Sequence, residues 1–485
     1  MKTEHEMKTP KVCIVGAGMS GMLMAIKLLK QGKNNFVIYE KTNNVGGTWR
    51  ENRYPGVACD VASFAYCYAF EPNPNWSKRF SGGAEIQQYF ESVAKKYQLH
   101  DYIRFNTQVE QAQYEDHQWQ VTLQDGTKDA FDILVAATGP LHHKKYPAIK
   151  GLDSFSGKVF HTADWVDDYD ETGKRIGLLG SGSSGVQATW PLAQKAKKLT
   201  VFMRTPQWIL PTPNPHYGPL AQWLKRKIPL IGWMTRKFYD WVGDQFGRAA
   251  LYRGFRRRMV AKVCLWYLNK IEDKTLREKL RPDHEAMCKR MIVSDNYYAA
   301  LQQTNVHVER TDIECIKPEG ILTKDGHLHK LDLLVLATGF YPNAWGIKHV
   351  VGIDGKTLDD VWKDEVGRNY CSIASPGFPN FFMLIGPNSP ITNLSLIDIA
   401  DIGVDFILRC IDKMERGEFK ALMPTHEAAC DFGQRLMSSF DDTIWVTGCN
   451  SWYLDGSSVP QTWPWLPSKF RKDLKEPNMA HFDTL

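Results

Sequence analysis

The stretch VCIVGAGMSGMLMAIKLLKQG, residues 12–32, holds a strand, a glycine turn and the start of a helix. The apolar run VCIV predicts a buried parallel strand, and the apolar periodicity that follows predicts a helix. Between them, Gly16, Gly18 and Gly21 let the backbone approach a pyrophosphate, which would accept hydrogen bonds from free N–H groups at the helix start. The stretch therefore predicts the opening of a dinucleotide-binding fold.

The next apolar run, FVIYEK at 36–41, predicts the second strand of the same sheet, and it ends in Glu40. At this place in the fold, a carboxylate accepts hydrogen bonds from ribose hydroxyls. Glu40 therefore indicates an adenine dinucleotide without a 2′-phosphate at the first site.

A second glycine loop repeats the design in IGLLGSGSSGVQ, residues 176–187, and LTVFMRTP at 199–206 predicts its following strand. Arg204 lies 19 residues beyond Gly185, the same offset that separates Glu40 from Gly21. A guanidinium at this corner suits a 2′-phosphate, so the second site is expected to prefer NADPH to NADH. The loop glycines and hydroxyls expected to bind this cofactor are Gly180, Gly182, Ser183, Ser184 and Gly185.

Two further runs, ILVAATGP at 133–140 and LLVLATGF at 333–340, each predict a buried strand that ends in Ala-Thr-Gly. At a strand's carboxyl end, Thr138 and Thr338 with their glycines would let backbone pass close to a cofactor. The alternative for these runs is a strand followed by an ordinary turn, and the alternative for both glycine loops is a turn that binds nothing. The repeated context favours an α/β fold with two Rossmann-like domains.

Length and composition place the chain among multidomain globular proteins. Its 485 residues suggest roughly three domains, and 43% hydrophobic and 24% charged residues are ordinary for soluble proteins. No apolar run is long enough to cross a bilayer and MKTEHEMKTP lacks a signal-peptide core, so a cytoplasmic location is expected. The ten cysteines include no C-x-x-C pair, so neither a metal site nor a disulfide framework is expected and the thiols are interpreted as reduced.

The stretch GGTWRENRYPGVACD, residues 46–60, resembles the first signature of type I Baeyer–Villiger monooxygenases, through Gly47, Trp49, Tyr54, Pro55, Gly56 and Asp60. FSGKVFHTADW, residues 155–165, matches the second signature of that family at Phe155, Gly157, His161 and Trp165. The resemblance runs from Lys11 to about Trp465. Flavin monooxygenases that oxidise nitrogen or sulfur share parts of both patterns.

This resemblance implies FAD at the first site and NADPH at the second. It also implies insertion of one oxygen atom of O2 beside the carbonyl of a ketone or aldehyde through a C4a-peroxyflavin, which gives an ester or lactone, with sulfoxidation as a side activity. Two alternatives stay open: a monooxygenase of nitrogen and sulfur atoms, and a non-oxygenating redox sensor that binds the same cofactors.

The segment EAMCKRMIVSDNYY, residues 285–298, looks like the family segment that supplies the catalytic arginine. By this match Arg290 would stabilise the peroxide, Asp60 would pair with Arg290, and Lys289 would bind the NADPH 2′-phosphate. A permanently charged donor suits an anion in a dry cleft. The alternative is a solvated basic pair.

The resemblance assigns further contacts to both cofactors and to the substrate. The additional cofactor-binding residues are Gly47, Thr48, Trp49, Asp60, Tyr66, Val109, Gln187, Thr205 and Trp452. The substrate pocket would be lined by Ile391, Thr392, Asn393, Leu394 and Trp452, from the loops GPNSPITNLS and CNSWYLDG. Ordinary loop packing is the alternative for both loops.

The second signature would link the two nucleotide domains and couple cofactor occupancy to domain position. His161 can bridge two backbone groups through its two nitrogens, and Trp165 offers a large apolar face with one donor. The alternative is that His161 is a structural histidine and Trp165 a packing anchor.

These features divide the chain into an FAD domain, an NADPH domain, a helical subdomain and a linker. The expected boundaries are 1–141 with 376–485 for FAD, 151–213 with 286–375 for NADPH, 214–285 for the helices, and 142–150 with the neighbouring 155–165 for the linker.

The helical insertion carries its own charge, with 16 Lys or Arg against seven Asp or Glu. Its apolar residues Tyr252, Phe255, Met259, Val263 and Tyr267 have helical spacing. One interpretation is weak contact with an anionic membrane surface; the other is a solvated cationic face over a core stripe. No nucleic-acid module is recognised, and monomer and homodimer both stay open.

Overall fold

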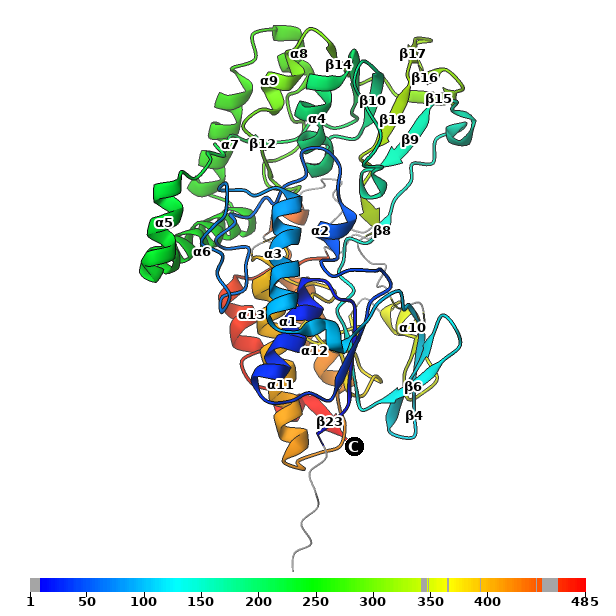
Figure 1. Cartoon of the computed structure of the whole chain (residues 1–485), viewed down its shortest axis with the longest axis vertical. Coiled ribbons are helices and arrows are strands. Elements are labelled where there is room, and N and C mark those ends of the chain that lie inside the picture. The colour runs from blue at the N-terminus through cyan, green and yellow to red at the C-terminus, as the bar shows by residue number, and fades with distance from the viewer. Residues whose placement is uncertain are drawn as a thin grey trace, which may run out of the picture.

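The computed structural model describes residues 9–341, 347, 349–363, 366–392, 394–441, 443–446 and 461–485. Two lobes are stacked along the long axis of the molecule, and the chain passes from the first to the second and back again (Figure 1).

The first domain is built on a five-stranded parallel sheet. Its strands, in spatial order, are β21 (Phe381–Met383), β7 (Ile133–Ala136), β1 (Val12–Val15), β2 (Phe36–Tyr39) and β3 (Ile103–Arg104). All four residues of β1 and of β7 are buried, which suits strands covered on both faces. Helix α1 (Met19–Lys30) packs beside α11 (Leu396–Glu415), where Lys27 pairs with Asp401 at 2.8 Å.

The second domain repeats this plan with a second five-stranded parallel sheet. Its strands are β14 (Val306–Glu309), β11 (Lys198–Phe202), β10 (Arg175–Leu179), β18 (Leu333–Leu336) and β9 (Lys158–His161). The strand before the glycine loop, β10, lies between β11 and β18, just as β1 lies between β2 and β7. Helix α4 (Ser183–Lys195) follows β10 and packs beside α9 (Tyr297–Leu301). The prediction of two Rossmann-like domains is confirmed.

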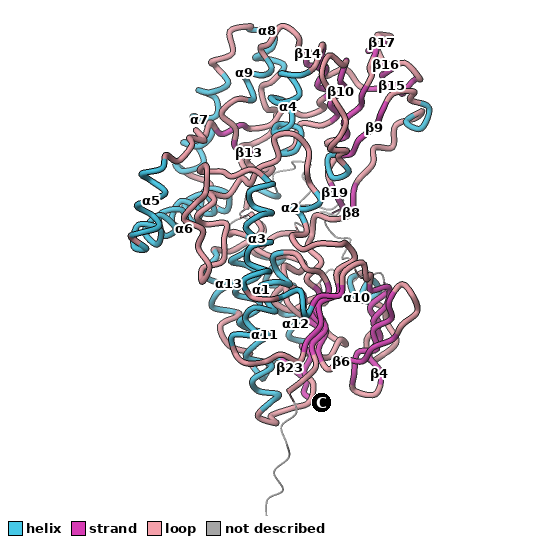
Figure 2. Tube along the Cα trace, viewed as in Figure 1, coloured by secondary structure: helices cyan, strands magenta, loops and turns pink. Residues whose placement is uncertain are grey.

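Each domain also carries a small sheet of antiparallel strands, which are magenta in Figure 2. In the second domain it consists of β15 (Ile313–Lys317), β16 (Gly320–Thr323) and β17 (Leu328–Lys330). In the first it consists of β4 (Val109–Glu115), β5 (Gln118–Leu123) and β6 (Lys128–Phe131), with β20 (His349–Val351) added in parallel on β4. Because β20 pairs with β4, the chain re-enters the first domain before residue 349, earlier than the expected boundary at 376.

Two crossings of the chain between the domains lie side by side. Strand β8 (His143–Lys144) runs toward the second domain and pairs antiparallel with β19 (Phe340–Tyr341), which runs back. Thr338 donates a hydrogen bond from its hydroxyl to the Lys145 carbonyl at 2.6 Å. Within the predicted linker, His143–Lys144 forms one strand of this two-stranded connection, whereas Lys158–His161 of the neighbouring segment forms β9 in the sheet of the second domain.

The helical insertion contains α5 (Pro219–Lys227), α6 (Pro229–Leu251), α7 (Phe255–Leu268) and α8 (Lys274–Lys279). Helices α5 and α6 project from one side of the molecule, between the two lobes (Figure 1). Arg236 of α6 pairs with Asp398 of α11 at 2.6 Å, which ties the insertion to the first domain.

The proposed core stripe of this insertion is wrong for four of its five residues. Tyr267 is buried, but Tyr252, Phe255, Met259 and Val263 are exposed. Helical spacing identifies an apolar face without saying whether that face meets protein or solvent.

The remaining helices and strands complete the two lobes. They are α2 (Thr48–Glu51), α3 (Gly83–Lys96), β12 (Ile209–Leu210), β13 (Ile292–Val293), α10 (Leu358–Trp362), β22 (Leu422–Pro424), α12 (His426–Ser438), α13 (Pro467–Asp473) and β23 (Phe482–Thr484). Within the described ranges, no helix combines the length and the apolar character needed to span a bilayer.

The cysteines correct one further expectation. Eight of them are free thiols: Cys13, Cys59, Cys67, Cys264, Cys315, Cys371, Cys410 and Cys430. Cys288 is disulfide-bonded. The interpretation of all ten as reduced is wrong at Cys288, because the sequence shows only local spacing and residues far apart in the chain can meet in the fold.

Candidate active site

The first glycine loop forms a close junction between β1, α1 and β7. Gly16 has φ +105°, and a Cβ there would lie 2.8 Å from the Ala137 carbonyl oxygen and 3.7 Å from Thr138 Cα. Gly18 is the N-cap of α1, and a Cβ there would meet only Gly47 at 3.7 Å. Because glycine has no side chain to cap the helix, the first N–H groups of α1 stay available to an anion.

Glu40 closes the same site from the end of β2. Its buried carboxylate accepts hydrogen bonds from the backbone N–H of Ala17 at 2.8 Å and of Thr42 at 2.9 Å. These bonds hold Glu40 against the glycine loop, where the sequence predicted a ribose-binding acid.

The first signature begins beside this loop. Thr48 starts α2, and the Trp49 indole donates to the Tyr66 hydroxyl at 3.1 Å. That hydroxyl lies 3.6 Å from the sulfur of Met19, the first residue of α1. Val109 starts β4 and is buried. Thr48, Trp49 and Tyr66 are therefore gathered at the start of α1.

The second glycine loop has the same geometry as the first. Gly180 has φ +122°, and a Cβ there would lie 2.3 Å from the Ala337 carbonyl oxygen. Gly185 lies against Gly180, since a Cβ on Gly185 would be only 2.2 Å from the Gly180 carbonyl oxygen. Gly182 is the N-cap of α4, with open space around its Cα, and Ser183 and Ser184 begin that helix. A second uncapped helix start is thus available to a pyrophosphate.

Three cations gather near the end of β11. Burial lowers the pKa of Lys289, Asp283 opposes this shift, and the charge of Arg204 lowers the pKa further. The Arg310 guanidinium donates to the Arg204 carbonyl at 3.2 Å, and the Thr205 carbonyl accepts from Ser181 at 2.7 Å. Like charges held this close favour a dianionic ligand such as a 2′-phosphate.

Arg290 and Asp60 are brought together, as predicted, across 230 residues of sequence. The guanidinium donates to both carboxylate oxygens, Nε at 2.7 Å and Nη2 at 2.8 Å, and Nη1 lies 3.4 Å from the Ile391 carbonyl. Burial alone would raise the pKa of Asp60, but Arg290 outweighs it and holds that pKa below its usual value. The pair therefore stays ionised at neutral pH, between the first signature and the 386–395 loop.

The first signature also contacts the second domain. The Tyr54 hydroxyl donates to Gln187 Oε1 at 2.6 Å, and Gln187 Nε2 donates to the Ala58 carbonyl at 2.9 Å. A Cβ on Gly56 would lie 2.3 Å from the Gln187 carbonyl oxygen. Glycine at 56 thus allows the loop that carries Asp60 to lie directly on α4.

The second signature holds the connection between the domains. Ala163 donates its N–H to His161 Nδ1 at 3.2 Å, so Nε2 carries the proton and donates to the Gly339 carbonyl at 3.1 Å. Burial lowers the pKa of His161, so the neutral ring is favoured. The bridge between two backbone groups favours a structural role for His161.

The other three residues of this signature are packed. Phe155 and Trp165 are buried, and the Trp165 ring lies 5.6 Å from that of Phe160. Gly157 leaves no room for a side chain, because a Cβ would lie 2.5 Å from the Asp332 carbonyl oxygen.

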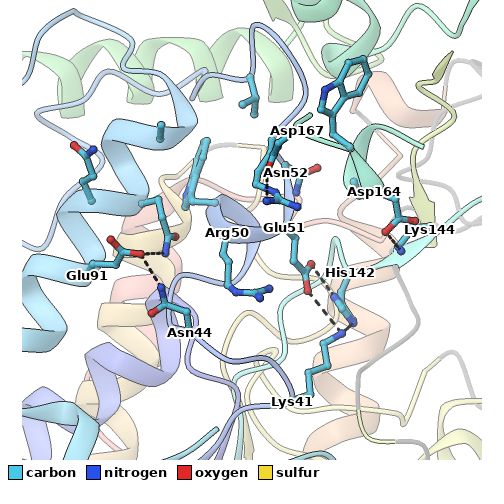
Figure 3. Close-up of a pocket in the computed structure, with 18 residues that line it drawn as sticks. Lys41, Asn44, Arg50, Glu51, Asn52, Glu91, His142, Lys144, Asp164 and Asp167 are labelled. Carbon is cyan, nitrogen blue, oxygen red and sulfur yellow. Dashed lines mark hydrogen bonds and ion pairs between the residues drawn. The ribbon is translucent and has the colours of Figure 1, made fainter. Parts of the chain in front are cut away.

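A polar cavity of about 870 Å³ lies where the first domain meets this connection (Figure 3). Glu51 there pairs with His142 at 3.1 Å and with Lys41 at 3.7 Å. Arg53 pairs with Asp167 in the same way across the boundary. The residues lining the cavity include Trp49 and Trp165 but neither glycine loop nor Arg290, so we assign it to the domain junction rather than to the reaction site.

The predicted substrate loop is only partly described. Ile391 and Leu394 are half-buried, and the Thr392 hydroxyl lies 3.3 Å from that of Thr462. The predicted site residues Asn393 and Trp452 lie outside the described residues. The Ile391 carbonyl lies against Arg290, 3.4 Å from its Nη1.

Comparison with known proteins agrees with this geometry. The model of the flavin-binding monooxygenase-like family matches residues 9–346. A Baeyer-Villiger monooxygenase of Streptomyces coelicolor is 34% identical, over 99% of this chain and 94% of that protein. An uncharacterised monooxygenase of Mycobacterium tuberculosis is 42% identical, over 98% of this chain and 96% of that protein. The chain belongs to the flavin-binding monooxygenase-like family.

Solved structures extend the likeness of this flavin-binding monooxygenase-like chain over nearly its whole length. OTEMO in complex with FAD and NADP has a TM-score of 0.88 and 28% identity, over 99% of this chain and 100% of that one. Cyclohexanone monooxygenase from Rhodococcus sp. Phi1, bound to NADP+, has a TM-score of 0.87 and 27% identity, over 98% and 99% of the two chains.

Sequence reasoning about this monooxygenase missed Arg310, Tyr54 as a partner of Gln187, and the carbonyl of Ile391. Arg310 directly follows the strand next to β11, so the order of strands in the sheet would have placed it beside Arg204. The Tyr54–Gln187 and Arg290–Ile391 contacts join segments far apart in the chain, so no local sequence pattern predicts them.

Proposed function

We propose that this protein is an FAD- and NADPH-dependent Baeyer–Villiger monooxygenase, which converts a ketone or aldehyde into an ester or lactone. The observation that carries the proposal is the bidentate Asp60–Arg290 pair, set between the first signature and the 386–395 loop. Support comes from relatives named for this reaction that cover almost the whole chain.

The residues of both loops fit the two cofactors. The uncapped start of α1 at Gly18, with Glu40 beside it, suits the pyrophosphate and ribose of FAD. The uncapped start of α4 at Gly182, with the cations Arg204 and Lys289, suits NADPH and its 2′-phosphate. When bound, FAD reduced by NADPH supplies the chemistry that activates O2 and delivers one oxygen atom to the carbonyl.

Arg290 is the residue we assign to the reaction itself. Its charge is permanent, and Asp60 fixes its orientation through two hydrogen bonds. A preoriented guanidinium stabilises negative charge that develops in the transition state, because it needs no reorganisation when that charge appears. Asp60 acts through Arg290 and is a positioning residue.

The proposal is tested with the FAD-loaded enzyme, NADPH and a panel of linear, cyclic and aryl ketones. The expected result is ketone-stimulated NADPH oxidation matched by ester formation, with little H2O2 released. Formation of sulfoxides from sulfides with no ester from any ketone would contradict the ketone assignment, and NADPH oxidation that no substrate stimulates would contradict oxygenation altogether.

Arg290→Ala tests the catalytic assignment. Ester formation should fall by at least about 100-fold while FAD stays bound, because a preorganised charged donor is lost. The matched control is Arg281→Ala, since Arg281 is an exposed arginine that pairs with Glu278 within one helical turn. Ester formation by Arg290→Ala at the control rate would overturn the role.

A further inference from the structure

The helical insertion presents an unusual surface. Of the nineteen exposed large hydrophobic side chains in the described part of the chain, thirteen lie between residues 220 and 266. They are Leu220, Trp223, Ile228, Leu230, Trp233, Met234, Phe238, Trp241, Tyr252, Phe255, Met259, Val263 and Trp266, and together they are called the aromatic face. Scattered exposed apolar residues are normal, but a concentration in three adjacent helices marks an interaction surface.

The spacing within α6 aligns its exposed residues. Leu230, Met234, Phe238 and Trp241 follow one another at intervals of four, four and three residues, and Trp233 lies next to them. They are 56–60% exposed. This spacing puts them on one side of the helix.

Helix α7 repeats the arrangement. Phe255, Met259, Val263 and Trp266 also follow one another at intervals of four, four and three residues, and they are 37–70% exposed. Two adjacent helices thus each expose an apolar stripe.

Positive charge surrounds the aromatic face. Residues 219–270 contain twelve Lys or Arg and two acids, Asp240 and Asp244, neither of which is fully exposed. Both acids are engaged within α6, Asp240 with Lys237 and Asp244 with Arg248. The exposed cations Lys227, Arg253, Arg258 and Lys262 form no ion pair with any described residue.

Other side chains of these helices fix the insertion to the first domain. Arg236 pairs with Asp398 at 2.6 Å and donates to the Cys67 carbonyl at 2.9 Å. Lys225 of α5 lies 3.8 Å from the ring centre of Phe64. These contacts hold α5 and α6 in place at the side of the molecule from which they project (Figure 1), while the residues of the aromatic face stay exposed.

We propose that the aromatic face docks on the surface of an anionic lipid bilayer, with α6 lying in the plane of the interface. Tryptophan and other large apolar side chains insert at the level of the lipid headgroups, while surrounding lysine and arginine side chains attract anionic lipids. A second copy of this chain is a poorer occupant, because two such surfaces would bring like charges together without exposed acids to neutralise them. The inference goes beyond the catalytic function and does not depend on it.

The test is flotation of the full-length, FAD-loaded protein with vesicles of phosphatidylcholine alone, or of equimolar phosphatidylcholine and phosphatidylglycerol. Wild type should float with the anionic vesicles and less with the neutral ones, and added salt should release it. Trp233→Ser with Trp241→Ser should abolish flotation. Neutralising Lys227, Arg253, Arg258 and Lys262 to Gln should lower partitioning by about two to three orders of magnitude, since each charge near the surface contributes separately.

Matched controls use the same substitutions elsewhere on the surface. Ile353→Ser removes an exposed apolar residue from the first domain. The charge control changes the exposed lysines Lys95, Lys128, Lys158 and Lys198 to Gln. Both should float like wild type, and retained FAD absorbance verifies that each variant is folded.

Wild-type protein that stays in the soluble fraction with anionic vesicles at low salt would overturn the proposal. So would a concentration-dependent dimer that the two tryptophan substitutions abolish while vesicle binding is unchanged, because the occupant would then be a second copy. Because flotation measures binding without turnover, either result leaves the proposed reaction untouched.

Discussion

At the scale of single residues, Arg204 and Lys289 are the two cations that we propose to bind the 2′-phosphate of NADPH. Burial lowers the pKa of Lys289, and repulsion from the charge of Arg204 lowers it further. A 2′-phosphate between them would relieve this repulsion, so part of the affinity for NADPH comes from removing an unfavourable interaction of the free protein.

Lys289→Gln should therefore raise KM for NADPH by about tenfold to a hundredfold, the value of one lost charge-assisted hydrogen bond. KM for NADH should be almost unchanged, because NADH has no 2′-phosphate. The measurement is steady-state kinetics with both coenzymes, and Lys274→Gln, an exposed lysine of α8, is the control. An equal loss for NADH and NADPH would show that Lys289 acts elsewhere.

His161 makes a second prediction at this scale, for the pH dependence of stability. Its pKa is lower in the folded protein than the ordinary 6.5, so the folded state favours the neutral ring. This contribution is complete above pH 6.5 and is lost as pH falls through the lowered pKa. The free energy of unfolding should therefore decline with acidification in this window.

The decline should be shallower in His161→Asn, measured by urea unfolding over a series of pH values. His216→Asn is the matched control, because it makes the same substitution at an exposed position. Identical slopes for wild type and His161→Asn would mean that the ring is not held neutral.

Local chemistry determined how much of the site could be predicted from the sequence. Gly16, Gly18 and Glu40 could be interpreted from the residues alone, because turn, pyrophosphate and ribose impose residue types at fixed offsets. The role of Arg290 came only from a resemblance, since its partner Asp60 is 230 residues away. Arg310 was not predicted as part of the site, because the sequence does not show the order of strands that places it beside Arg204.

At the scale of helices, strands and loops, the close contact between the first signature and α4 depends on one glycine. Gly56→Ala should destabilise the protein, because the new methyl group meets the Gln187 carbonyl oxygen at 2.3 Å and a residue with φ +86° favours glycine. Gly126→Ala is the matched control, with φ +84° and nothing within 4 Å of the added carbon.

Gly56→Ala should lower the free energy of unfolding by about 2 kcal/mol more than Gly126→Ala does. Because both glycines have nearly the same φ, this difference measures overpacking alone. Chemical denaturation of both variants provides the measurement. Equal losses would show that the signature loop can move away from α4 without cost.

Helix α7 shows that apolar spacing predicts a helix but does not predict what its apolar face contacts. The spacing of Phe255, Met259 and Val263 correctly predicted a helix with one apolar face. That the face meets solvent depends on where α6 and the first domain lie, and this is a property of the tertiary structure.

At the scale of the whole molecule, the Arg236–Asp398 pair connects an insertion of the second domain to a helix of the first. Both side chains are largely buried, at 17% and 12% exposure. Arg236→Met should therefore lower the free energy of unfolding by about 3 kcal/mol, because it leaves a buried carboxylate without a partner. The double variant Arg236→Met with Asp398→Leu should lower this free energy by a smaller amount.

Urea unfolding of the single and double variants measures this coupling. Arg248→Met is the control, since Arg248 pairs with Asp244 one turn away on a partly exposed surface and should cost less than about 1 kcal/mol. A double variant as unstable as the sum of its parts would exclude a direct coupling.

The division into two nucleotide domains and a helical insertion followed from repeated local patterns and is seen in the structure. The boundary expected at 376 could not be placed correctly, because β20 joins β4 more than 200 residues earlier in the chain. The spacing of the cysteines likewise did not reveal that Cys288 is disulfide-bonded.

The pairing of β8 with β19 has a mechanical consequence for the whole enzyme. If a single segment connected the two domains, one domain could rotate freely about that segment. Two hydrogen-bonded strands resist such twisting but can still bend. We therefore expect any reorientation of the two domains to follow one hinge axis across the β8–β19 pair. A coenzyme bound to the second domain would then move along a fixed arc over the first domain.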